Sequence, residues 1–318
     1  MALTALTALV LSLPLKAANS TNTLAIEGIT VLLSEDAGAY SEFAQNLINS
    51  LALPGNSKTS VKIIPLASFK IEDLSRSANG QLLIAVGTPA MHALQQKPPA
   101  MSVLNVLVPR TSYNKAIKQT AKPLDPHRFS AIYVDQSWNR QMALIRAAMQ
   151  KIQPRVGMLI GKESTEFIPG LQAAAKETEL SLQFETINED ADLLPALRKL
   201  LVSSDAIMAI PDPVIYNRNN IPSILLTSYR QQIPLFGFSA SYVKAGALAA
   251  VYSLPAQIAQ QVAEIIQTMP SSGYLPLPQH PKYFSVNVNA QVQHSLGLAM
   301  DSEAELVKKI KHISERGQ

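Results

Sequence analysis

The sequence predicts an α/β protein of two Rossmann-like lobes, each a parallel sheet flanked by helices, from its length, its alternating segments and their repetition. The chain has 318 residues, more than a single hydrophobic core usually serves. Short β-branched runs alternate with amphipathic stretches, which is the pattern of a parallel sheet between helices. The alternation occurs twice in succession, and this repetition predicts two similar lobes.

The first lobe is expected to begin with a strand at 29–34. Apolar residues then recur at helical spacing from Tyr40 to Leu51, which predicts a helix. Further strands are predicted at 61–65, 82–86, 103–108 and 129–134, with helices after the first three strands of the lobe. A polar stretch near 110–113 predicts a loop after the fourth strand.

The second lobe is predicted to open at the capping cluster Asp135-Gln136-Ser137, which begins a helix with Trp138 and Met142 on one face. Its strands are expected at 156–160, 182–187, 206–210 and 235–238, with helices near 168–179, 193–203 and 223–231. A Gly/Ala-rich segment at 245–250, a helix at 255–269, a strand at 283–288 and a final helix pair follow. These late elements either extend the second lobe or cross back to the first, and crossing back would create a hinge.

The beginning of the sequence has the features of a secretory signal peptide. Residues 2–15 are apolar and uncharged, with Pro14 near their end, and this run is too short to span a bilayer. The small residues of Ala18-Asn19-Ser20 suit a cleavage site, so a signal peptide is predicted at 1–20 and a mature start near Thr21. The alternative is a buried amino-terminal strand or helix. No later stretch is long and apolar enough to predict a membrane span after cleavage.

Charge and cysteine content narrow the possible partners. The net charge is only +4, and the lysines near the end of the chain alternate with glutamates, as on a solvated helix face. No nucleic-acid partner is therefore expected. The chain has no cysteine, which excludes disulfides, thiolate metal sites and attachment of lipid to an amino-terminal cysteine. We expect a protein that diffuses freely in the periplasm.

Motifs of enzymes are missing from the sequence. The dipeptide Gly161-Lys162 lacks the glycine that a phosphate-binding loop needs five positions earlier, where Val156 stands. Neither GxGxxG nor GxSxG occurs, and the five histidines have no metal-ligand spacing. The sequence thus predicts no catalytic residue, metal or cofactor, and a hydrolase or isomerase on a two-lobed sheet is the least favoured alternative.

Several segments stand out by their order and spacing: 155–160, 171–176, 205–212, 233–237, 244–249 and the ending 287–298, with the turn Val86-Gly87-Thr88-Pro89-Ala90 in the first half. Together they resemble the ABC-transporter substrate-binding family that includes receptors for tryptophan and other aromatic amino acids. The resemblance implies a periplasmic-binding-protein fold of the first type, with three crossovers near 135, 251 and 282. Lobe 1 would then comprise 24–134 and 252–280, and lobe 2 would comprise 135–251 and 282–318.

The resemblance implies a solute-binding protein that closes its two lobes over a small polar organic ligand, with an aromatic amino acid as one candidate, and delivers it to an ABC permease. An alternative is a periplasmic adaptor that presents the closed shape to a membrane sensor kinase or cyclase. The loop Tyr216-Asn217-Arg218-Asn219 and the missing lipid-anchor cysteine suggest this second kind of partner.

Candidate ligand contacts are sought in the loops that follow the strands, because ligands of open α/β sheets bind outside the carboxyl ends of the strands. Asp212, between two prolines, is predicted to present its carboxylate at the rim to a ligand ammonium; the alternative is a turn that its side chain stabilises. The other candidates are Tyr40, Thr88, Ser164, Thr165, Ser239 and Tyr242. The alternative role is helix capping for Thr88, Ser164 and Thr165, and helix packing for Tyr40 and Tyr242.

Overall fold

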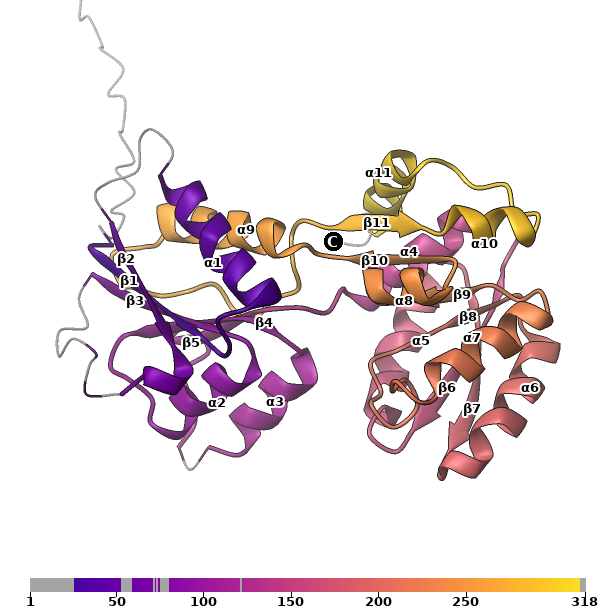
Figure 1. The fold of residues 1–318 in the computed structure, drawn as a ribbon, viewed down its shortest axis with the longest axis horizontal. Coiled ribbons are helices and arrows are strands. Elements are labelled where there is room, and N and C mark those ends of the chain that lie inside the picture. Colours follow the sequence, from indigo (N-terminus) through magenta and orange to yellow (C-terminus); the bar gives the residue numbers. More distant parts are fainter. Residues whose placement is uncertain are drawn as a thin grey trace, which may run out of the picture.

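The computed structural model describes residues 26–52, 59–70, 72, 74, 80–120 and 122–314. The predicted signal peptide at 1–20 lies outside the described residues. Figure 1 shows two α/β lobes side by side, joined by extended segments. Each lobe has its own sheet, and the helices pack on both faces of each sheet. The predicted fold class is confirmed.

The first sheet has five parallel strands in the described part of the chain, in the order β2-β1-β3-β4-β5. The strands are β1 (Gly28–Leu33), β2 (Ser60–Pro65), β3 (Gln81–Val86), β4 (Ser102–Val108) and β5 (Phe129–Tyr133). All five overlap the predicted ranges. Because β1 lies between β2 and β3, and the chain then continues to β4 and β5, the order reverses beside β1, and loops from β1 and β3 meet at one edge.

Helices cover both faces of the first sheet. On one face, α1 (Gly38–Leu51) and α9 (Pro255–Gln267) pack their buried Phe43, Leu47 and Val262 against the strands. On the other face lie α2 (Thr88–Gln96) and α3 (Arg110–Lys118), with Met91 and Tyr113 buried. Thus α9, which comes more than a hundred residues after β5, belongs to the first lobe (Figure 1).

The predicted loop near 110–113 is wrong, because α3 begins at Arg110. The short sequence of α3 is polar and carries few apolar residues, so its helical periodicity is weak. The first backbone N–H of the helix, that of Arg110, donates a hydrogen bond of 2.5 Å to Asp135 Oδ2, which lies 25 positions later in the sequence. The buried Tyr113 side chain then fixes the helix on the sheet by donating to the Phe129 carbonyl. After β2 the chain forms a 3₁₀ turn, Leu66–Ser68, and the helix predicted to follow β2 falls largely outside the described residues.

The second sheet is six-stranded in the described residues, in the order β11-β10-β9-β8-β6-β7. The strands are β6 (Arg155–Gly161), β7 (Ser181–Ile187), β8 (Ala206–Met208), β9 (Leu235–Gly237), β10 (Ala249–Tyr252) and β11 (Ser285–Val288). Only β11 is antiparallel to its neighbour. Strand β10 was not predicted, because its small residues Ala249 and Ala250 look like a Gly/Ala-rich linker, although both are fully buried.

The helices of the second lobe pack against one large core. They are α4 (Trp138–Ala148), α5 (Ile168–Glu177), α6 (Leu193–Ser203), α7 (Ile221–Arg230), α8 (Ala240–Ala245), α10 (Ala290–Ser295) and α11 (Glu303–Ser314). The predicted cap of α4 is confirmed, since Ser137 Oγ accepts from the Arg140 N–H. None of the helices in the described ranges is long and apolar enough to cross a membrane.

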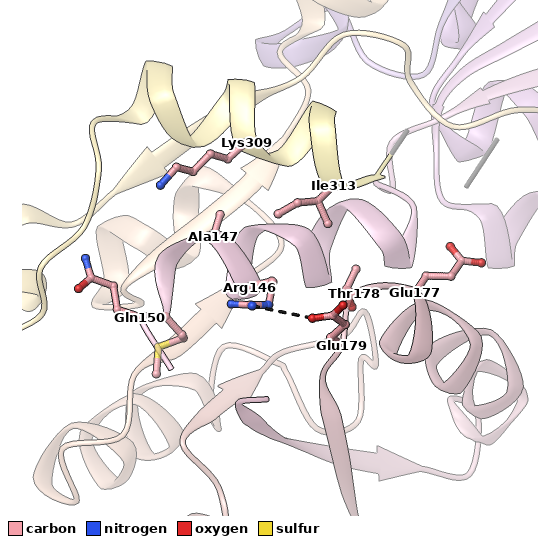
Figure 2. Close-up of a pocket in the computed structure, with 9 residues that line it drawn as sticks. Arg146, Ala147, Gln150, Glu177, Thr178, Glu179, Lys309 and Ile313 are labelled. Atoms are coloured by element: carbon pink, nitrogen blue, oxygen red, sulfur yellow. Dashed lines mark ion pairs between the residues drawn. The ribbon is translucent and has the colours of Figure 1, made fainter. Parts of the chain in front are cut away.

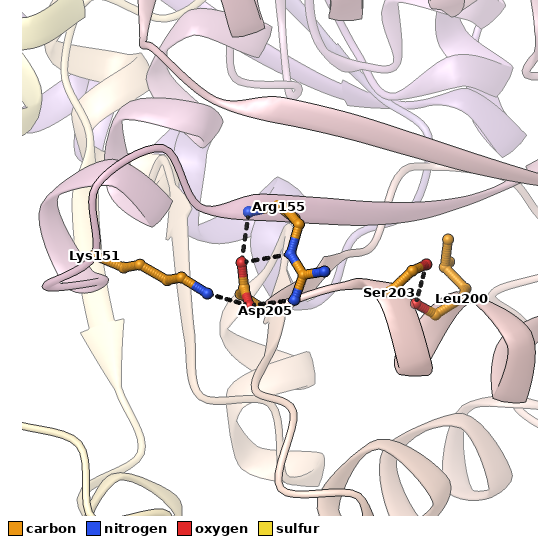
Figure 3. A network of polar contacts seen from close by, with 5 residues as sticks. All are labelled: Lys151, Arg155, Leu200, Ser203 and Asp205. Atoms are coloured by element: carbon orange, nitrogen blue, oxygen red, sulfur yellow. Dashed lines mark hydrogen bonds and ion pairs between the residues drawn. The ribbon is translucent and has the colours of Figure 1, made fainter.

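A charged cluster closes the end of the second sheet where β6 and β8 begin (Figure 3). The Asp205 carboxylate accepts from the Arg155 Nη2 at 2.9 Å, the Arg155 backbone N–H at 2.9 Å and Lys151 Nζ at 2.6 Å. These hydrogen bonds hold the carboxylate in its charged form, and the pKa of Asp205 is lowered, first by the Arg155 side chain. The cluster lies at the amino ends of the strands, opposite the edge where ligands bind in such sheets.

The chain passes between the lobes three times in the described residues (Figure 1). The first connection runs from β5 to α4, and the second runs from β10 to α9. The third begins after Gln279, which still pairs with β5, and leads to β11. Side chains join these connections. Gln136 Nε2 donates to Ser253 Oγ at 2.8 Å, and Ser253 in turn donates to the Tyr283 carbonyl.

Candidate functional site

The loops that follow β1 and β3 place two predicted residues of the first lobe together. Gly87, with φ of 89°, turns the chain into α2, so Thr88 is the first helical residue and stays half-buried. The helix is capped by Ser34, whose Oγ accepts from the Ala90 N–H at 3.0 Å and donates to the Val86 carbonyl at 2.7 Å. The Tyr40 ring lies against Gly87, where a Cβ atom would be 2.8 Å from Tyr40 Cζ. Thr88 is therefore free of the capping role.

In the second lobe, Asp212 and Ser164 meet at the carboxyl ends of β8 and β6. Asp212 is only 2% exposed. Its carboxylate accepts from Ser164 Oγ at 2.6 Å and from the backbone N–H of Val214 at 3.0 Å and of Ile215 at 3.3 Å. The expected presentation of this carboxylate at the rim is therefore wrong, because the Pro-Asp-Pro turn folds the side chain inward onto local donors.

Close approach of the chain explains the burial of this pair. A Cβ atom on Gly161 would lie 2.6 Å from Asp212 Oδ2, so only glycine leaves room for the carboxylate. Ser164 Oγ also accepts from the Gly161 N–H at 2.9 Å. The neighbouring Thr165 is exposed and donates to the Gly161 carbonyl at 3.1 Å. The pair thus fixes the shape of the loop after β6.

The last two predicted residues lie at the start of α8. Ser239 is the residue before the helix and is half-buried, while Tyr242 is only 8% exposed. The Tyr242 hydroxyl donates to the Tyr216 carbonyl at 3.2 Å, and its ring centroid is 4.5 Å from that of Phe238. In this conformation Tyr242 packs inside the lobe, as its packing alternative expects. Its role and that of Ser239 in ligand binding stay predictions.

A cleft of about 560 Å³ separates the facing walls of the two lobes. The lobe 1 wall is formed by α3, which contributes Thr111, Lys115 and Lys118 at helical spacing. The lobe 2 wall consists of the loops after β6 and β8. Its lining residues are Glu163, Glu166, Phe167, Pro211 and Pro213. Prolines on both sides of Asp212 therefore line the cleft, although the Asp212 side chain does not.

The cleft continues to an inner recess beside the connections, and in this conformation the recess encloses only about 10 Å³. Thr111, Phe167 and Pro211 line both parts, and the recess adds Arg110, Asp135, Gln136, Trp138 and His280. The rings of Trp138 and Phe167 lie together with centroids 5.3 Å apart, and the Arg110 guanidinium carbon is 6.0 Å from the Trp138 centroid. The recess thus combines two aromatic rings with a guanidinium.

Burial and local charges set the protonation of the recess. Burial raises the pKa of the Asp135 carboxyl, while the hydrogen bond from the Arg110 amide and the nearby charge of Arg110 oppose this rise. The His280 ring donates through Nδ1 to the Asp135 carbonyl at 2.8 Å. Burial lowers the pKa of His280, and the Arg110 charge lowers it too, so the imidazole is neutral at pH 7. Within the described residues, the Arg110 guanidinium forms no hydrogen bond or ion pair, although its charge acts on the nearby Asp135 carboxyl.

Sequence reasoning did not identify Arg110, His280 and Trp138 as residues that line the recess. Trp138 was placed on a helix face without a ligand role, and Arg110 was placed in a loop. The signal that could have identified them is the capping cluster at Asp135, because a chain that leaves one lobe there must place its neighbours at the interlobe boundary. The predicted residues lie at the correct edges of the sheets but do not line this recess in the part of the chain that is described.

A second pocket, of about 430 Å³, lies on lobe 2 alone between α4, α5 and α11 (Figure 2). Its side chains are of both charges. Arg146 Nη2 lies 3.9 Å from Glu179 Oε2, and Lys309 is paired with Asp301. Lobe 1 contributes nothing to this pocket, so a ligand there would not bridge the lobes. No group of histidine, aspartate and glutamate side chains suited to a metal ion occurs among the described residues.

Two α/β lobes, three connections and a cleft between strand-end loops define the architecture of periplasmic binding proteins of the first type. Solved structures with this fold cover most of the chain. A ligand-free, open substrate binding protein with adhesive properties from Clostridium difficile has 15% identity and a TM-score of 0.67, covering 87% of this chain and 97% of its own. An ABC domain in complex with L-Trp from Streptococcus pneumonia has 15% identity and a TM-score of 0.54, covering 89% and 97%.

A conserved domain protein from Vibrio cholerae has 18% identity and a TM-score of 0.56, covering 89% of this chain and 98% of its own. At these identities the structures show the fold. Residues 134–278 match the model of the family described as ABC transporter substrate binding protein. The predicted resemblance to ABC-transporter substrate-binding proteins is therefore confirmed. No curated protein matches the sequence.

Proposed function

We propose that this chain is a substrate-binding protein of the ABC-transporter type that captures a small polar organic molecule in the interlobe cleft. The observation that carries the proposal is the composition of the inner recess. Arg110 comes from lobe 1, Trp138 and Phe167 from lobe 2, and Asp135 and His280 from two of the connections. The recess, of about 10 Å³ in this conformation, would have to widen to admit a ligand, and one ligand there would then contact both lobes and two of the three connections.

The side chains of the recess indicate the chemistry of the ligand. The Arg110 guanidinium favours a carboxylate, which it can bind through two parallel hydrogen bonds. Trp138 and Phe167 offer flat apolar surface to a ring. An aromatic amino acid is the first candidate, and the similar fold of the Streptococcus pneumonia domain in complex with L-Trp supports testing it first.

Closure of the lobes would couple ligand binding to recognition by a partner. A ligand that contacts both walls favours the closed population over the open one by its extra contacts in the closed form. We propose that the three connections act as the hinge, with lobe 1 comprising 24–134 and 252–280 and lobe 2 comprising 135–251 and 282–318. Thr88, Thr165, Ser239 and Tyr40, which keep accessible surface, remain proposed ligand contacts. Ser164, Asp212 and Tyr242 are buried in this conformation and are proposed to shape their loops, and ligand contact by these three residues stays a prediction.

The partner that suits this function is an ABC permease, and the compartment is the periplasm. The proposal involves ligand capture without chemistry, so no catalytic residue is assigned. The predicted signal peptide at 1–20 would direct export, and a mature chain starting near Thr21 would follow cleavage.

Thermal unfolding with a metabolite panel tests the proposal directly. A ligand at a hundred times its dissociation constant stabilises the folded state by about 2.7 kcal/mol, which raises the melting temperature by several degrees. The panel should contain aromatic amino acids, their deaminated acids and their amines. We expect stabilisation that the Arg110→Gln variant loses. A broad panel that stabilises neither protein, or stabilises both equally, would contradict binding in this recess.

A further inference from the structure

The two walls of the cleft carry opposite charges at its mouth. Helix α3 has no acidic residue, and Lys115 and Lys118 lie one turn apart on the face that lines the cleft. The facing lobe 2 wall contributes Glu163 and Glu166, one on each side of the Ser164–Thr165 turn. Lys162 in the same loop is exposed and does not line the cleft. The electrostatic pattern is therefore basic against acidic.

These four charged side chains form no ion pair with other described residues. Within the described ranges, Lys115, Lys118, Glu163 and Glu166 form no ion pair, and no hydrogen bond joins α3 to the loops after β6 and β8. Some charged side chains of lobe 2 are paired, such as Lys199 with Glu185 at 2.8 Å. The mouth therefore holds two cations and two anions that face each other across an open gap.

The charges lie apart from the proposed ligand. Arg110, at the first turn of α3, reaches the inner recess, whereas Lys115 and Lys118 follow five and eight residues later. At about 1.5 Å per residue these lysines are roughly 7 and 12 Å further out along the helix. A ligand held by Arg110 and Trp138 would leave them uncovered.

We propose that Lys115 and Lys118 pair with Glu163 and Glu166 when the lobes close, and that this electrostatic latch sets how much of the protein is closed. The inference rests on the proposed closure but assigns a role to residues that do not touch the ligand. Exposed pairs each contribute little and are screened by salt. Two pairs together correspond to a change of roughly 3- to 30-fold in the closed-to-open ratio.

The absence of cysteine from the chain makes a clean test possible. Asn114→Cys on α3 and Pro213→Cys on the facing loop place one thiol on each wall without changing the four charges. Closed molecules form a disulfide in mild oxidant, so the initial rate of crosslinking reports the closed fraction in ligand-free protein. We expect the rate to fall as salt rises.

Charge reversal gives the decisive comparison in this background. Lys115→Glu with Lys118→Glu should slow crosslinking roughly 3- to 30-fold at low salt, and so should Glu163→Lys with Glu166→Lys. The variant that carries all four reversals restores opposite charges and should recover the rate. Lys308→Glu with Lys311→Glu on α11 is the matched control for the lysine reversals, because it lowers the net charge by the same amount at exposed sites outside the cleft.

The latch is refuted if the reversed variants crosslink at the rate of the control, or if the four-fold reversal fails to recover the rate. Circular dichroism and thermal unfolding of each variant verify that slow crosslinking does not reflect unfolding. The latch and the proposed function fail separately. If a ligand stabilises the protein but the crosslinking rate depends on neither salt nor the four charges, only the latch is rejected. If the crosslinking rate depends on the charges but no molecule of the panel binds, only the proposed function is rejected.

Discussion

Gln136 and Ser253, 117 positions apart in the chain, are joined by a hydrogen bond of 2.8 Å from Nε2 to Oγ. Ser253 Oγ in turn donates a hydrogen bond to the Tyr283 carbonyl. Each of these residues belongs to a different connection between the lobes, so one chain of hydrogen bonds crosses all three. Arg140 Nη1 adds a second link, because it donates to Gln136 Oε1 and to the Pro281 carbonyl, each at 2.7 Å. The connections therefore form a single unit.

Ser253→Ala should lower the free energy of unfolding by about 1–3 kcal/mol. The substitution leaves the Gln136 amide, which belongs to a residue only 4% exposed, without its acceptor, and an unsatisfied buried donor costs about this much. Urea unfolding of the ligand-free protein measures the change. Ser41→Ala, which removes an exposed hydrogen bond to Asp36, is the control and should change stability by less than about 0.5 kcal/mol. Equal effects of the two substitutions would contradict the role of the connection.

Asp212→Ala should cost more stability than the loss of an exposed carboxylate. Its carboxylate is buried and serves three donors, including Ser164 Oγ, so about 2–4 kcal/mol is expected. Asp301→Ala, which breaks only the exposed pair with Lys309, should cost less than about 1 kcal/mol. Urea unfolding compares them. An Asp212→Ala protein as stable as the parent would show that the carboxylate is free for a ligand.

The positions of most strands along the chain could be predicted from the sequence, because runs of apolar and β-branched residues are typical of buried strands. Each predicted strand overlaps an observed one, and the predicted end of the helix at Ser203 matches α6. Elements whose stability comes from distant residues were not predicted. Helix α3 depends on the Asp135 carboxylate, which follows Arg110 by 25 positions. Strand β10 is defined by its pairing with β9 and β11. It was not predicted because its alanines do not give the alternation of apolar and polar residues that indicates a strand.

The sequence placed the candidate residues at the carboxyl edge of each sheet, but it did not predict which side chains line the inner recess. The rule that ligands bind outside the carboxyl ends of strands located the loops near Thr88 and Asp212. It does not say which way a side chain points, and Asp212 points inward because Gly161 leaves space for it. The pairing of Arg110 with Trp138 requires the lobes to be placed relative to each other, which no local pattern encodes.

Asp205 should make folding stability depend on acid pH. Its pKa is lowered in the folded protein by the hydrogen bonds from Arg155 and Lys151, against about 3.9 in the unfolded chain. A group with a lowered folded pKa contributes stability above its unfolded pKa and loses it as pH falls toward the folded pKa. The Arg155 side chain is 45% exposed, so screening reduces the contribution to about 1–2 kcal/mol at pH 7.

Asp205→Asn measures this contribution. The variant should be less stable than the parent at pH 7, and the difference should shrink progressively as the pH falls from about 4 toward 2. Urea unfolding of both proteins across this range gives the difference directly, and other carboxylates cancel because both proteins contain them. A difference that stays constant with pH would show that the charge of Asp205 is not what stabilises the cluster.

Arg110→Gln and Trp138→Leu should each weaken ligand binding while leaving the fold intact. Loss of a charge-assisted hydrogen bond corresponds to about 1.5–3 kcal/mol, or roughly 10- to 150-fold in affinity, and loss of the ring surface to a smaller factor. Arg110→Lys keeps the charge but not the paired donors, so its affinity should lie between those of the parent and Arg110→Gln. Calorimetric titration with the best ligand of the panel measures these effects.

The matched control is Arg128→Gln in lobe 1. Arg128 has the same relation to an aromatic ring, with its guanidinium carbon 6.0 Å from the Tyr274 centroid, but it lines neither part of the cleft. Its substitution should leave affinity unchanged, because a general effect of removing one positive charge would be equal in both variants. If Arg128→Gln weakens binding as much as Arg110→Gln does, the two arginines act only through net charge, and the recess does not hold the ligand.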